Sequence, residues 1–332
     1  MGRWLSLARR VVLAVLAVYL ILSLTWAAVA LTPDPNEAQL RYAGAVDDQT
    51  SANETESAIQ AYREARGYDR PLLVRYRTWL VDMTTLDWGD SRSQTMAGPD
   101  GDPVPMPVTT ALARGIPNTL RYVLPALALA VGVGVTLGTH GALNPDSRTA
   151  RVGSVLSYFG SGFPNFYLAA FVPVVLAIPL DVLGSGLPRT VGPVSVGRTI
   201  LPVLVLTLGL LGSQIRYVRT EVLEYANEDF VRLVRSKGAS EWRVARHVLR
   251  NAALPLVALF VTEVLAVLVV DVFVIEYVFG IDGLGSLAYD AIFARDLPLV
   301  LGTTTVIVVV GVAGTLLQDL SHQSLDPRVG DD

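Results

Sequence analysis

Residues 229–255 read DFVRLVRSKGASEWRVARHVLRNAALP, a basic and polar stretch that separates two long apolar spans. Gly238 divides the stretch into two segments with the composition of short helices, and Pro255 stands where the next apolar span begins. Long apolar spans place a chain in a membrane but leave its function open. The polar stretch between them therefore carries the more specific information.

The chain has the composition of an all-α, polytopic membrane protein. Of its 332 residues 52% are hydrophobic, and the mean hydropathy of +0.46 is high for a soluble domain. A helix needs about 20 apolar residues to cross a bilayer. Six stretches are long enough, and they predict six transmembrane helices at about 11–31, 119–139, 152–180, 200–218, 255–275 and 298–317.

Basic residues predict the orientation of these helices, because short loops rich in arginine and lysine stay on the cytoplasmic side. Arg9 and Arg10 precede the first span, and Arg148 follows the second. The loop after the fourth span carries Lys237 and several arginines. Six spans place all of these loops on one side, so we expect a multi-pass protein of the cell membrane with both termini in the cytoplasm.

The predicted organisation has four parts. Residues 1–31 form an N-terminal membrane anchor and residues 32–118 an extracytoplasmic segment; residues 119–320 form the transmembrane core with a cytoplasmic loop at 219–254, and residues 321–332 a cytoplasmic tail. The first span has a second interpretation, because basic residues, an apolar run and Ala28-Val29-Ala30 also describe a cleavable signal peptide. The apolar run is longer than a usual signal core, which favours a retained helix.

Within residues 32–118 the sequence predicts a solvated surface region and then a helix. The first part, to residue 64, is acidic and polar. From Pro71 to Met83 apolar residues recur at helical spacing, and proline suits the first turn. A turn is expected at Pro99–Pro103. The segment is either a cap without chemistry or a docking surface for a solute-binding protein.

Residues 229–250 predict two short helices joined at a glycine, which we call the knob. Asp229 suits the N-cap or the first turn of a helix that runs through Lys237. Gly238 can end this helix because glycine tolerates positive φ, and Ser240 can cap the next one. Such a knob could transmit a push from a soluble partner to the flanking helices. The alternative is an ordinary loop whose arginines pair with lipid phosphates.

The knob resembles the cytoplasmic docking loop of binding-protein-dependent ABC importer permeases, in the dipeptide, oligopeptide and nickel branch. That branch has an acidic residue, an aromatic residue and V-R-x-x-R-x-K-G, followed later by R-H-x-L-R-N-A-x-x-P. The matching positions are Asp229, Phe230, Val231, Arg232, Arg235, Lys237, Gly238, Arg246, His247, Leu249, Arg250, Asn251, Ala252 and Pro255. The wider permease class has Glu-Ala-Ala where this chain has Arg232-Leu233-Val234, a departure that favours the peptide branch.

Other stretches extend the resemblance over most of the chain. They are Asp69, Pro71, Tyr76, Trp79-Leu80, Gly89 and Ser91 in the first external segment; Phe163-Pro164-Asn165-Phe166-Tyr167; Glu276 to Gly285 with Arg295-Asp296 and Pro298; and Leu325-Asp326-Pro327-Arg328. Glu276 to Gly285 resembles the family's external loop before the last span, although Asp282 stands where proline is usual. Residues 32–66 are the part least like the family.

The resemblance implies one permease subunit of an ATP-driven importer for peptides or related small solutes. Its implied partners are a second permease, two ATP-binding subunits, an extracytoplasmic solute-binding protein and membrane lipid. It further implies alternating access without covalent chemistry, so we expect no catalytic residue, no metal and no cofactor. The residues implied to couple the chain to the ATPase are Asp229, Arg232, Arg235, Lys237, Gly238, Ala239, Ser240, Arg246, Arg250 and Asn251.

Missing motifs agree with this interpretation. The sequence has no G-x-x-x-x-G-K-[ST] phosphate loop, no H-E-x-x-H and no G-x-S-x-G, and it has no cysteine. ATP hydrolysis would therefore take place in another chain, and no nucleic-acid partner is expected. Two alternatives stay open: a gradient-driven secondary transporter or channel, and a membrane anchor for a binding domain at 32–118.

Two acidic residues lie inside the fifth predicted span. Glu263 and Asp271 are eight positions apart, about 80° around an α-helix, so they could share a broad face. Ionisable groups at such depth usually face a cavity or a partner. One hypothesis is that both line the translocation path and favour a cationic or amine-bearing solute. The other is that Asp271 reaches the external interface and Glu263 pairs with a neighbouring subunit.

Overall fold

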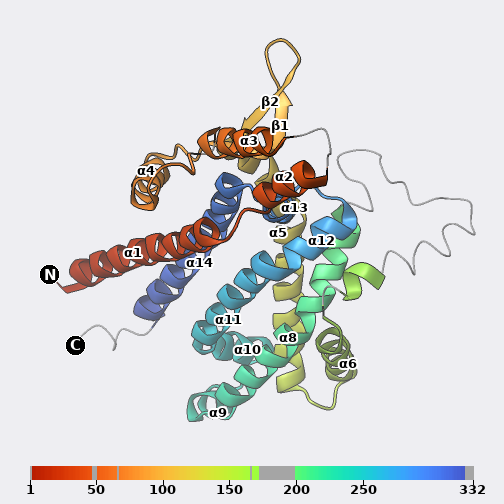
Figure 1. The fold of residues 1–332 in the computed structure, drawn as a ribbon. Coiled ribbons are helices and arrows are strands. Elements are labelled where there is room, and N and C mark those ends of the chain that lie inside the picture. Colours follow the sequence, from red (N-terminus) through yellow and green to blue (C-terminus); the bar gives the residue numbers. More distant parts are fainter. Residues whose placement is uncertain (1, 47–50, 66, 165–166, 172–198, 326–332) are drawn as a thin grey trace, which may run out of the picture. The chain divides into compact units, whose positions relative to one another are not determined.

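The structure is a computed structural model, and it describes residues 2–46, 51–65, 67–164, 167–171 and 199–325. The described chain is mainly helical (Figure 1), and its internal contacts divide it into two units. The first unit consists of Met1–Val15, Ala113–Tyr289 and Val306–Asp332, and the second of Leu16–Leu112 and Asp290–Thr305. The long helices α1 (Gly2–Leu31), α5 (Val108–Leu143) and α14 (Leu297–Leu325) contribute residues to both units.

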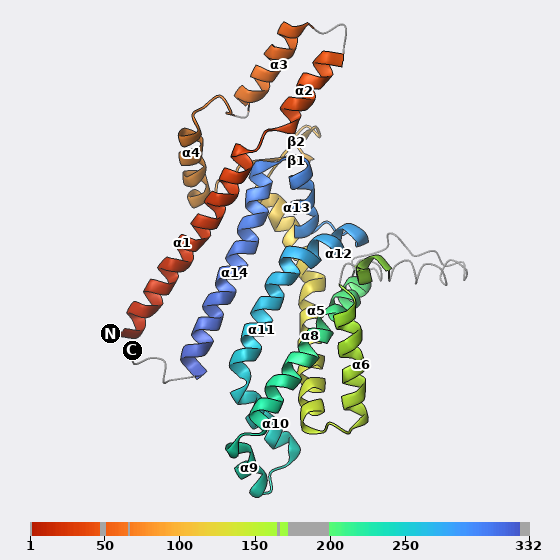
Figure 2. The same cartoon turned by 60° about the horizontal axis from the view of Figure 1, so that its bottom comes forward.

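The first unit holds most of the remaining helices. They are α6 (Arg148–Gly162), α8 (Leu201–Ala226), α9 (Asp229–Ser236), α10 (Glu241–Asn251), α11 (Ala253–Ala266), the π-helical segment η2 (Val267–Asp271), α12 (Val272–Phe279) and most of α13 (Leu284–Phe293). Helices α6 and α8 lie side by side (Figure 2). Their backbones approach closely where Gly160 meets Gly212, and a Cβ on Gly160 would lie 2.6 Å from the carbonyl oxygen of Leu208. Small residues permit such close crossings between membrane helices.

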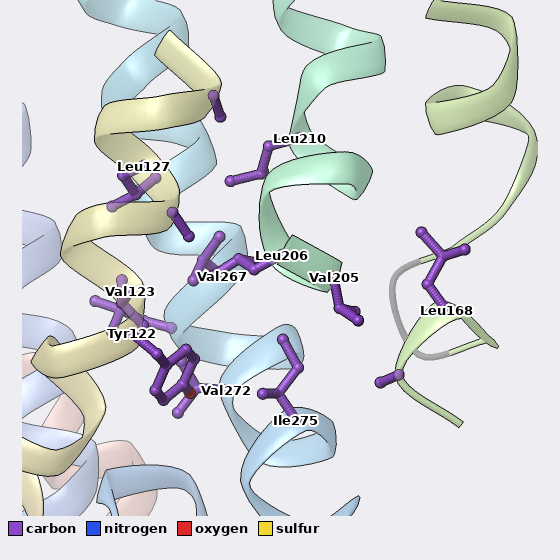
Figure 3. Packing of buried hydrophobic residues seen from close by; sticks show 14 of the residues in the cluster. Tyr122, Val123, Leu127, Leu168, Val205, Leu206, Leu210, Val267, Val272 and Ile275 are labelled. Atoms are coloured by element: carbon purple, nitrogen blue, oxygen red, sulfur yellow. The ribbon is translucent and has the colours of Figure 1, made fainter. Parts of the chain in front are cut away.

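The core of the first unit is apolar. Tyr122 and Leu127 of α5 pack with Leu206 of α8, Val267 of η2 and Ile275 of α12 (Figure 3). These side chains are all almost fully buried. The core therefore joins helices from both halves of the sequence and supports the membrane-spanning part of the unit.

Five helices in the described part of the chain are long and apolar enough to cross a membrane. They are Ala8–Leu31, Val108–Leu143, Leu201–Ala226, Ala253–Phe279 and Leu297–Asp319, and they confirm five of the six predicted spans. Helix α5 begins at Val108 rather than near residue 119, because it continues past the part that hydropathy detects. Helix α6 covers the start of the predicted span at 152–180, but the end of that span lies outside the described residues.

The second unit contains α2 (Pro35–Val46), α3 (Ala52–Ala65), α4 (Leu72–Thr85) and the antiparallel strands β1 (Asp90–Ala97) and β2 (Pro103–Pro107). The helix predicted from Pro71 onward is confirmed as α4, with Pro71 at its N-cap position. The predicted turn cluster connects the two strands, and the Gly98 N–H donates to the carbonyl of Asp102 at 2.8 Å.

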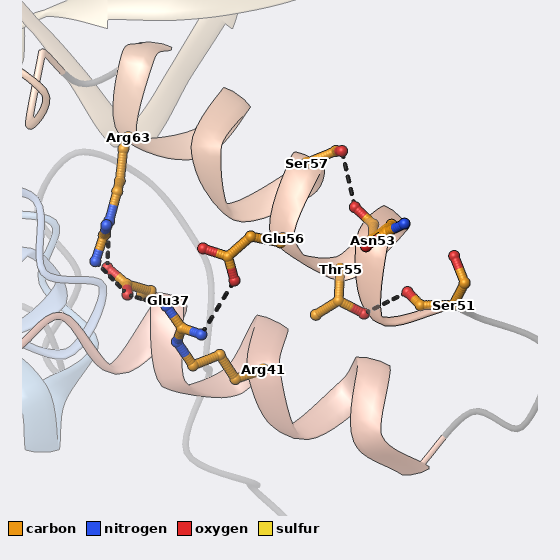
Figure 4. Close-up of polar contacts among 8 residues, drawn as sticks. All are labelled: Glu37, Arg41, Ser51, Asn53, Thr55, Glu56, Ser57 and Arg63. Atoms are coloured by element: carbon orange, nitrogen blue, oxygen red, sulfur yellow. Dashed lines mark hydrogen bonds and ion pairs between the residues drawn. The ribbon is translucent and has the colours of Figure 1, made fainter.

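Helices α2 and α3 form the solvated surface region that was predicted, although no helix was predicted within it. Their residues are mostly exposed, as their polarity predicted, but they form two helices that contact each other. Glu37 of α2 accepts hydrogen bonds from Arg63 of α3 at 2.7 and 3.0 Å (Figure 4). Arg41 of α2 lies 3.4 Å from Glu56 of α3. Such pairs cannot be recognised from hydrophobic periodicity.

Asp296 fixes the strand pair within the second unit. Its buried Oδ2 accepts hydrogen bonds from the Ser91 hydroxyl at 2.6 Å, the Arg92 N–H at 2.6 Å, and the N–H and hydroxyl of Ser93 at 2.9 Å. Its Oδ1 accepts from the Leu299 N–H at 3.2 Å, in the first turn of α14. One carboxylate thus attaches β1 to the connection before α14.

Candidate functional site

The knob consists of α9 and α10, joined by a turn at Gly238. Gly238 has φ +73°, as predicted for a glycine that ends a helix. Helix α9 ends at Ser236, one residue before the predicted end, and Lys237 is its C-cap. Asp229 lies in the first turn, one of its two predicted places, whereas Glu228 has the N-cap position. Ser240 has the N-cap position of α10, but its side chain makes no capping hydrogen bond.

The inner face of the knob is apolar and packs on two long helices. Val231 of α9 and Val244 and Val248 of α10 are buried against Val218 and Val222 of α8. The adjoining end of α5 contributes Ala142 and, partly buried, Val135 and Leu143. Val244 and Val248 lie four positions apart, one helical turn, and with Ala245 they are the buried residues of α10, whereas Val231 is the buried residue of α9. A displacement of the knob would therefore act directly on α5 and α8.

The outer face of the knob is basic. Most of the ten residues singled out from the sequence are exposed on it, and Ala239 is partly buried; the exposed ones are Asp229, Arg232, Arg235, Lys237, Gly238, Ser240, Arg246, Arg250 and Asn251. Asp229 and Arg232 approach to 3.5 Å, with 97% and 77% of their side chains exposed. Such an exposed pair contributes little to stability. The remaining cations are available to a partner.

Two apolar residues on this outer face were not among the predicted site residues. Leu233 is 55% exposed and Trp242 is 77% exposed. Neither lies on the face that buries the valines. An apolar residue away from the apolar face of a helix can be recognised in the sequence, and it indicates a contact surface. Exposed aromatic residues near arginines are typical of the centres of protein interfaces.

Glu263 forms its contacts inside the first unit. It is buried in α11 and accepts hydrogen bonds from Ser213, at 2.6 Å, and from Gln214 of α8. Asp271 lies at the end of η2 and is partly exposed. The π-helical segment corrects the assumption of one uninterrupted α-helix, so the 80° separation does not describe these two residues. Short π segments occur often at functional sites.

Glu276 lies in α12 and not in the loop where sequence comparison placed it. It is fully buried, and its Oε1 accepts hydrogen bonds from the hydroxyls of Thr119, at 2.6 Å, and Tyr122, at 3.2 Å, of α5. Its Oε2 accepts from the Ser286 N–H of α13 at 2.9 Å. The Thr119 hydroxyl also accepts from the Leu284 N–H. One carboxylate therefore holds three helices together, which the sequence alone did not indicate.

Long apolar helices and a basic two-helix knob are the features that the resemblance to importer permeases predicted. The chain belongs to the family described as binding-protein-dependent transport system inner membrane component, whose model matches residues 130–331. Members of this family are permease subunits of ABC transporters. They are not enzymes, and ATP hydrolysis takes place in separate subunits.

Individual relatives agree with this assignment. The chain is 33% identical to a candidate peptide permease protein of Brucella ovis over 83% of this chain and 85% of the relative. It is 30% identical to the oligopeptide transport system permease protein AppB of Bacillus subtilis, over 86% and 87%. It is 29% identical to the metal-staphylopine import system permease protein CntB of Staphylococcus aureus, over 85% of each. The chain is thus a multi-pass membrane protein of the peptide, oligopeptide and nickel branch.

Proposed function

We propose that this chain forms half of the translocation pathway of an ATP-driven importer for peptides or related small solutes. A second permease, two ATP-binding subunits and an extracytoplasmic solute-binding protein complete the importer. Both termini and the knob lie in the cytoplasm, where basic residues concentrate. Family membership supports a partner ATPase and a solute-binding protein, and the relatives named for peptides and for a metal complex support the class of solute.

One observation supports the knob as the contact with the ATPase. Its buried stripe is packed on α5 and α8, while its outer face presents several cations together with Leu233 and Trp242. A partner that moves this outer face moves the apolar stripe with it, because interiors are close-packed and transmit displacement. ATP-driven closure of the ATPase would thereby reorient the helices around the pathway.

Cysteine cross-linking tests this contact directly, because the chain has no cysteine of its own. We expect Leu233→Cys and Trp242→Cys to cross-link to an ATP-binding subunit in membranes that contain the whole importer. Asp282→Cys is the matched control, since Asp282 is exposed in the connection between α12 and α13. Equal cross-linking of all three variants, or none at the knob, would contradict the proposal.

Purification of the chain in mild detergent from its own membranes tests the importer itself. We expect mass spectrometry to find an ATPase with a phosphate loop and a second permease in the purified sample. Recovery of this chain alone, under conditions that preserve other complexes, would favour a gradient-driven carrier instead.

Glu263 and Asp271 stay candidates for the pathway. Their position in one apolar span supports a role in selecting a cationic or amine-bearing solute. The Glu263 carboxylate already has two donors in α8, so such a role requires that they release it during transport. Unchanged uptake of every substrate by the double variant Glu263→Gln and Asp271→Asn would contradict this role.

A further inference from the structure

Three of the five tryptophans of the chain line one pocket of the second unit. Trp26 of α1, Trp79 of α4 and Trp88, which follows α4, share it with Tyr68. The pocket has a cavity volume of about 340 Å³, at the lower end of the range of roughly 300–1,000 Å³ for small-molecule sites. We call it the tryptophan pocket.

The aromatic wall of this pocket is pre-arranged. The rings of Trp26 and Trp79 are stacked with their centroids 6.0 Å apart, and Trp26 is almost fully buried. The guanidinium of Arg75 already lies over the ring of Tyr68, 4.6 Å from its centroid. Aromatic faces attract cations. Because Trp26 is buried and Arg75 covers Tyr68, the partly exposed rings of Trp79 and Trp88 are the surface that suits an ammonium group.

Charges of both signs line the same pocket. Asp82 and Asp87 face it, and so do Arg70 and Arg92. Among the described residues, none of these four side chains forms an ion pair with another. Burial and the Asp87 carboxylate raise the pKa of Asp82, as expected for a carboxylate that lacks a cation. Asp82 is partly buried and the other three side chains are exposed, so the pocket presents solvated charges of both signs, which suit a ligand that carries both.

The indole N–H of Trp79 supplies a separate observation. This buried atom has no hydrogen-bond partner within the described part of the chain. The Trp88 N–H, by contrast, donates to the carbonyl of Met83 at 3.4 Å. A band of aromatic residues at a membrane interface would also gather tryptophans here. It would not account for a buried donor without an acceptor, which costs free energy. Because this atom has almost no accessible surface, the Trp79 ring must turn for a ligand in the pocket to accept its hydrogen bond.

We propose that the tryptophan pocket binds a zwitterionic ligand that carries an ammonium group and an anionic group. Asp82, Asp87 and the aromatic faces bind the ammonium group. Arg70, Arg92 and the Trp79 N–H bind the anionic group. Two sources share this chemistry: a short free peptide, with its amino and carboxylate termini, and the phosphoethanolamine headgroup of a lipid. The peptide source rests on the proposed function, whereas the lipid source does not.

Binding to the whole importer tests the free-peptide source. The complex is placed in nanodiscs without phosphatidylethanolamine, and binding of radiolabelled alanylalanine is measured without ATP or solute-binding protein. We expect saturable binding that an N-acetylated, C-amidated alanylalanine does not displace. Trp79→Phe, which keeps a ring but removes the donor, and Asp82→Asn should each weaken binding at least tenfold. Asp100→Asn, in the exposed turn between β1 and β2, is the matched control and should bind as the unmodified complex does.

Native mass spectrometry tests the lipid source. Complexes purified from membranes that contain phosphatidylethanolamine should retain it in the unmodified form and in Asp100→Asn, and lose it in Asp82→Asn. Size-exclusion chromatography shows that each variant is assembled. Loss of binding in Asp82→Asn supports the pocket as the binding site, and the experiment in which it occurs shows whether the ligand is a peptide or a lipid. Binding in neither experiment, or equal binding in Asp82→Asn, overturns it. The importer proposal fails separately, if no ATPase is purified with the chain.

Discussion

The knob and the α2–α3 pair are both made of two short helices that follow each other in the chain, yet they are held by opposite means. The knob buries Val231, Val244 and Val248 against α8 and keeps its charges outside. The α2–α3 pair is joined by Glu37–Arg63 and Arg41–Glu56, and Ile59 is the buried residue of α3. The stabilisation from buried apolar area is not screened by salt and depends on which residue is buried. Exposed ion pairs are screened by salt and contribute little to stability.

The difference implies that, of these two pairs of helices, the knob alone can transmit a displacement to the helices it packs on. An element that transmits displacement must be attached by close packing, and the knob meets that condition. The α2–α3 pair suits an adaptable surface. Substitutions in the two regions should therefore differ in effect on uptake, and the following predictions test that contrast from the largest expected effect to the smallest.

We expect Gly238→Val to abolish uptake while the protein still inserts into the membrane. A Cβ at Gly238 would meet nothing within 4 Å, so the effect comes from its φ of +73° and not from a collision. Left-handed backbone costs L-residues about 1–2 kcal/mol, and β-branched residues tolerate it least. Gly238→Asn is the matched control, because asparagine adopts this conformation more readily, and it should keep most of the uptake. Normal uptake by Gly238→Val would remove the turn from the mechanism.

We expect Val248→Ala to destabilise the knob by about 1–3 kcal/mol, because it removes buried methyl groups and leaves a cavity. The Val248 side chain is fully buried, whereas Arg243 on the same helix is exposed. Thermal unfolding of the purified importer should show a lower melting temperature for Val248→Ala and none of that change for Arg243→Ala. Equal shifts in the two variants would mean that the stripe does not hold the knob.

The same contrast explains what the sequence could predict. Five spans were predictable from the length of their apolar runs, helix α4 from apolar residues at helical spacing, and the knob from its capping residues and its glycine. Helices α2 and α3 were not, because their contacts join charged residues whose pairing is not visible in a local pattern. Glu276 illustrates a third case, since its partners Thr119 and Tyr122 are 157 and 154 positions away in the chain. Long-range hydrogen bonds of this kind leave no periodic signal.

The candidate site divides in the same way. The cations and Gly238 were singled out by the ordered resemblance; their coupling role stays a prediction, and the structure shows that they are exposed, as a contact surface requires. The exposure of Leu233 and Trp242 was not inferred from the sequence, although both lie off the stripe of buried valines. The angular separation of Glu263 and Asp271 around the helix could not be predicted, because no sequence pattern indicated the π-helical segment that ends at Asp271.

Neutralising the outer face of the knob should reduce uptake less than Gly238→Val does. We expect the triple variant Arg232→Gln, Arg235→Gln and Lys237→Gln to lower uptake about three- to tenfold, because cations at an interface steer and orient a partner. Uptake by the triple variant should fall with ionic strength less steeply than uptake by the unmodified importer, since fewer charges remain to be screened. Arg41→Gln in α2 is the control, and uptake assays should show no change for it. An equal loss in both variants would remove the distinction between the two regions.

The smallest effect is expected from Glu37→Gln in the α2–α3 pair. Hydrogen bonding to Arg63 lowers the pKa of Glu37 below its usual 4.5, so the ionised carboxylate is favoured in the folded state. Its contribution to stability is therefore fully present above about pH 4.5 and is lost as the pH falls through the lower, folded-state value. Hydrogen exchange of α2 amides at neutral pH should change by at most about fivefold, as for other exposed pairs.

Acid should remove that difference between Glu37→Gln and the unmodified chain, because both then carry a neutral side chain at this position. Gln60→Ala offers a control in α3, since its amide donates to Glu64 and not to Glu37. A loss of protection in Glu37→Gln that persists unchanged below pH 3 would assign the effect to packing instead of charge. The α2–α3 pair would then be held as the knob is, and the contrast between the two regions would not stand.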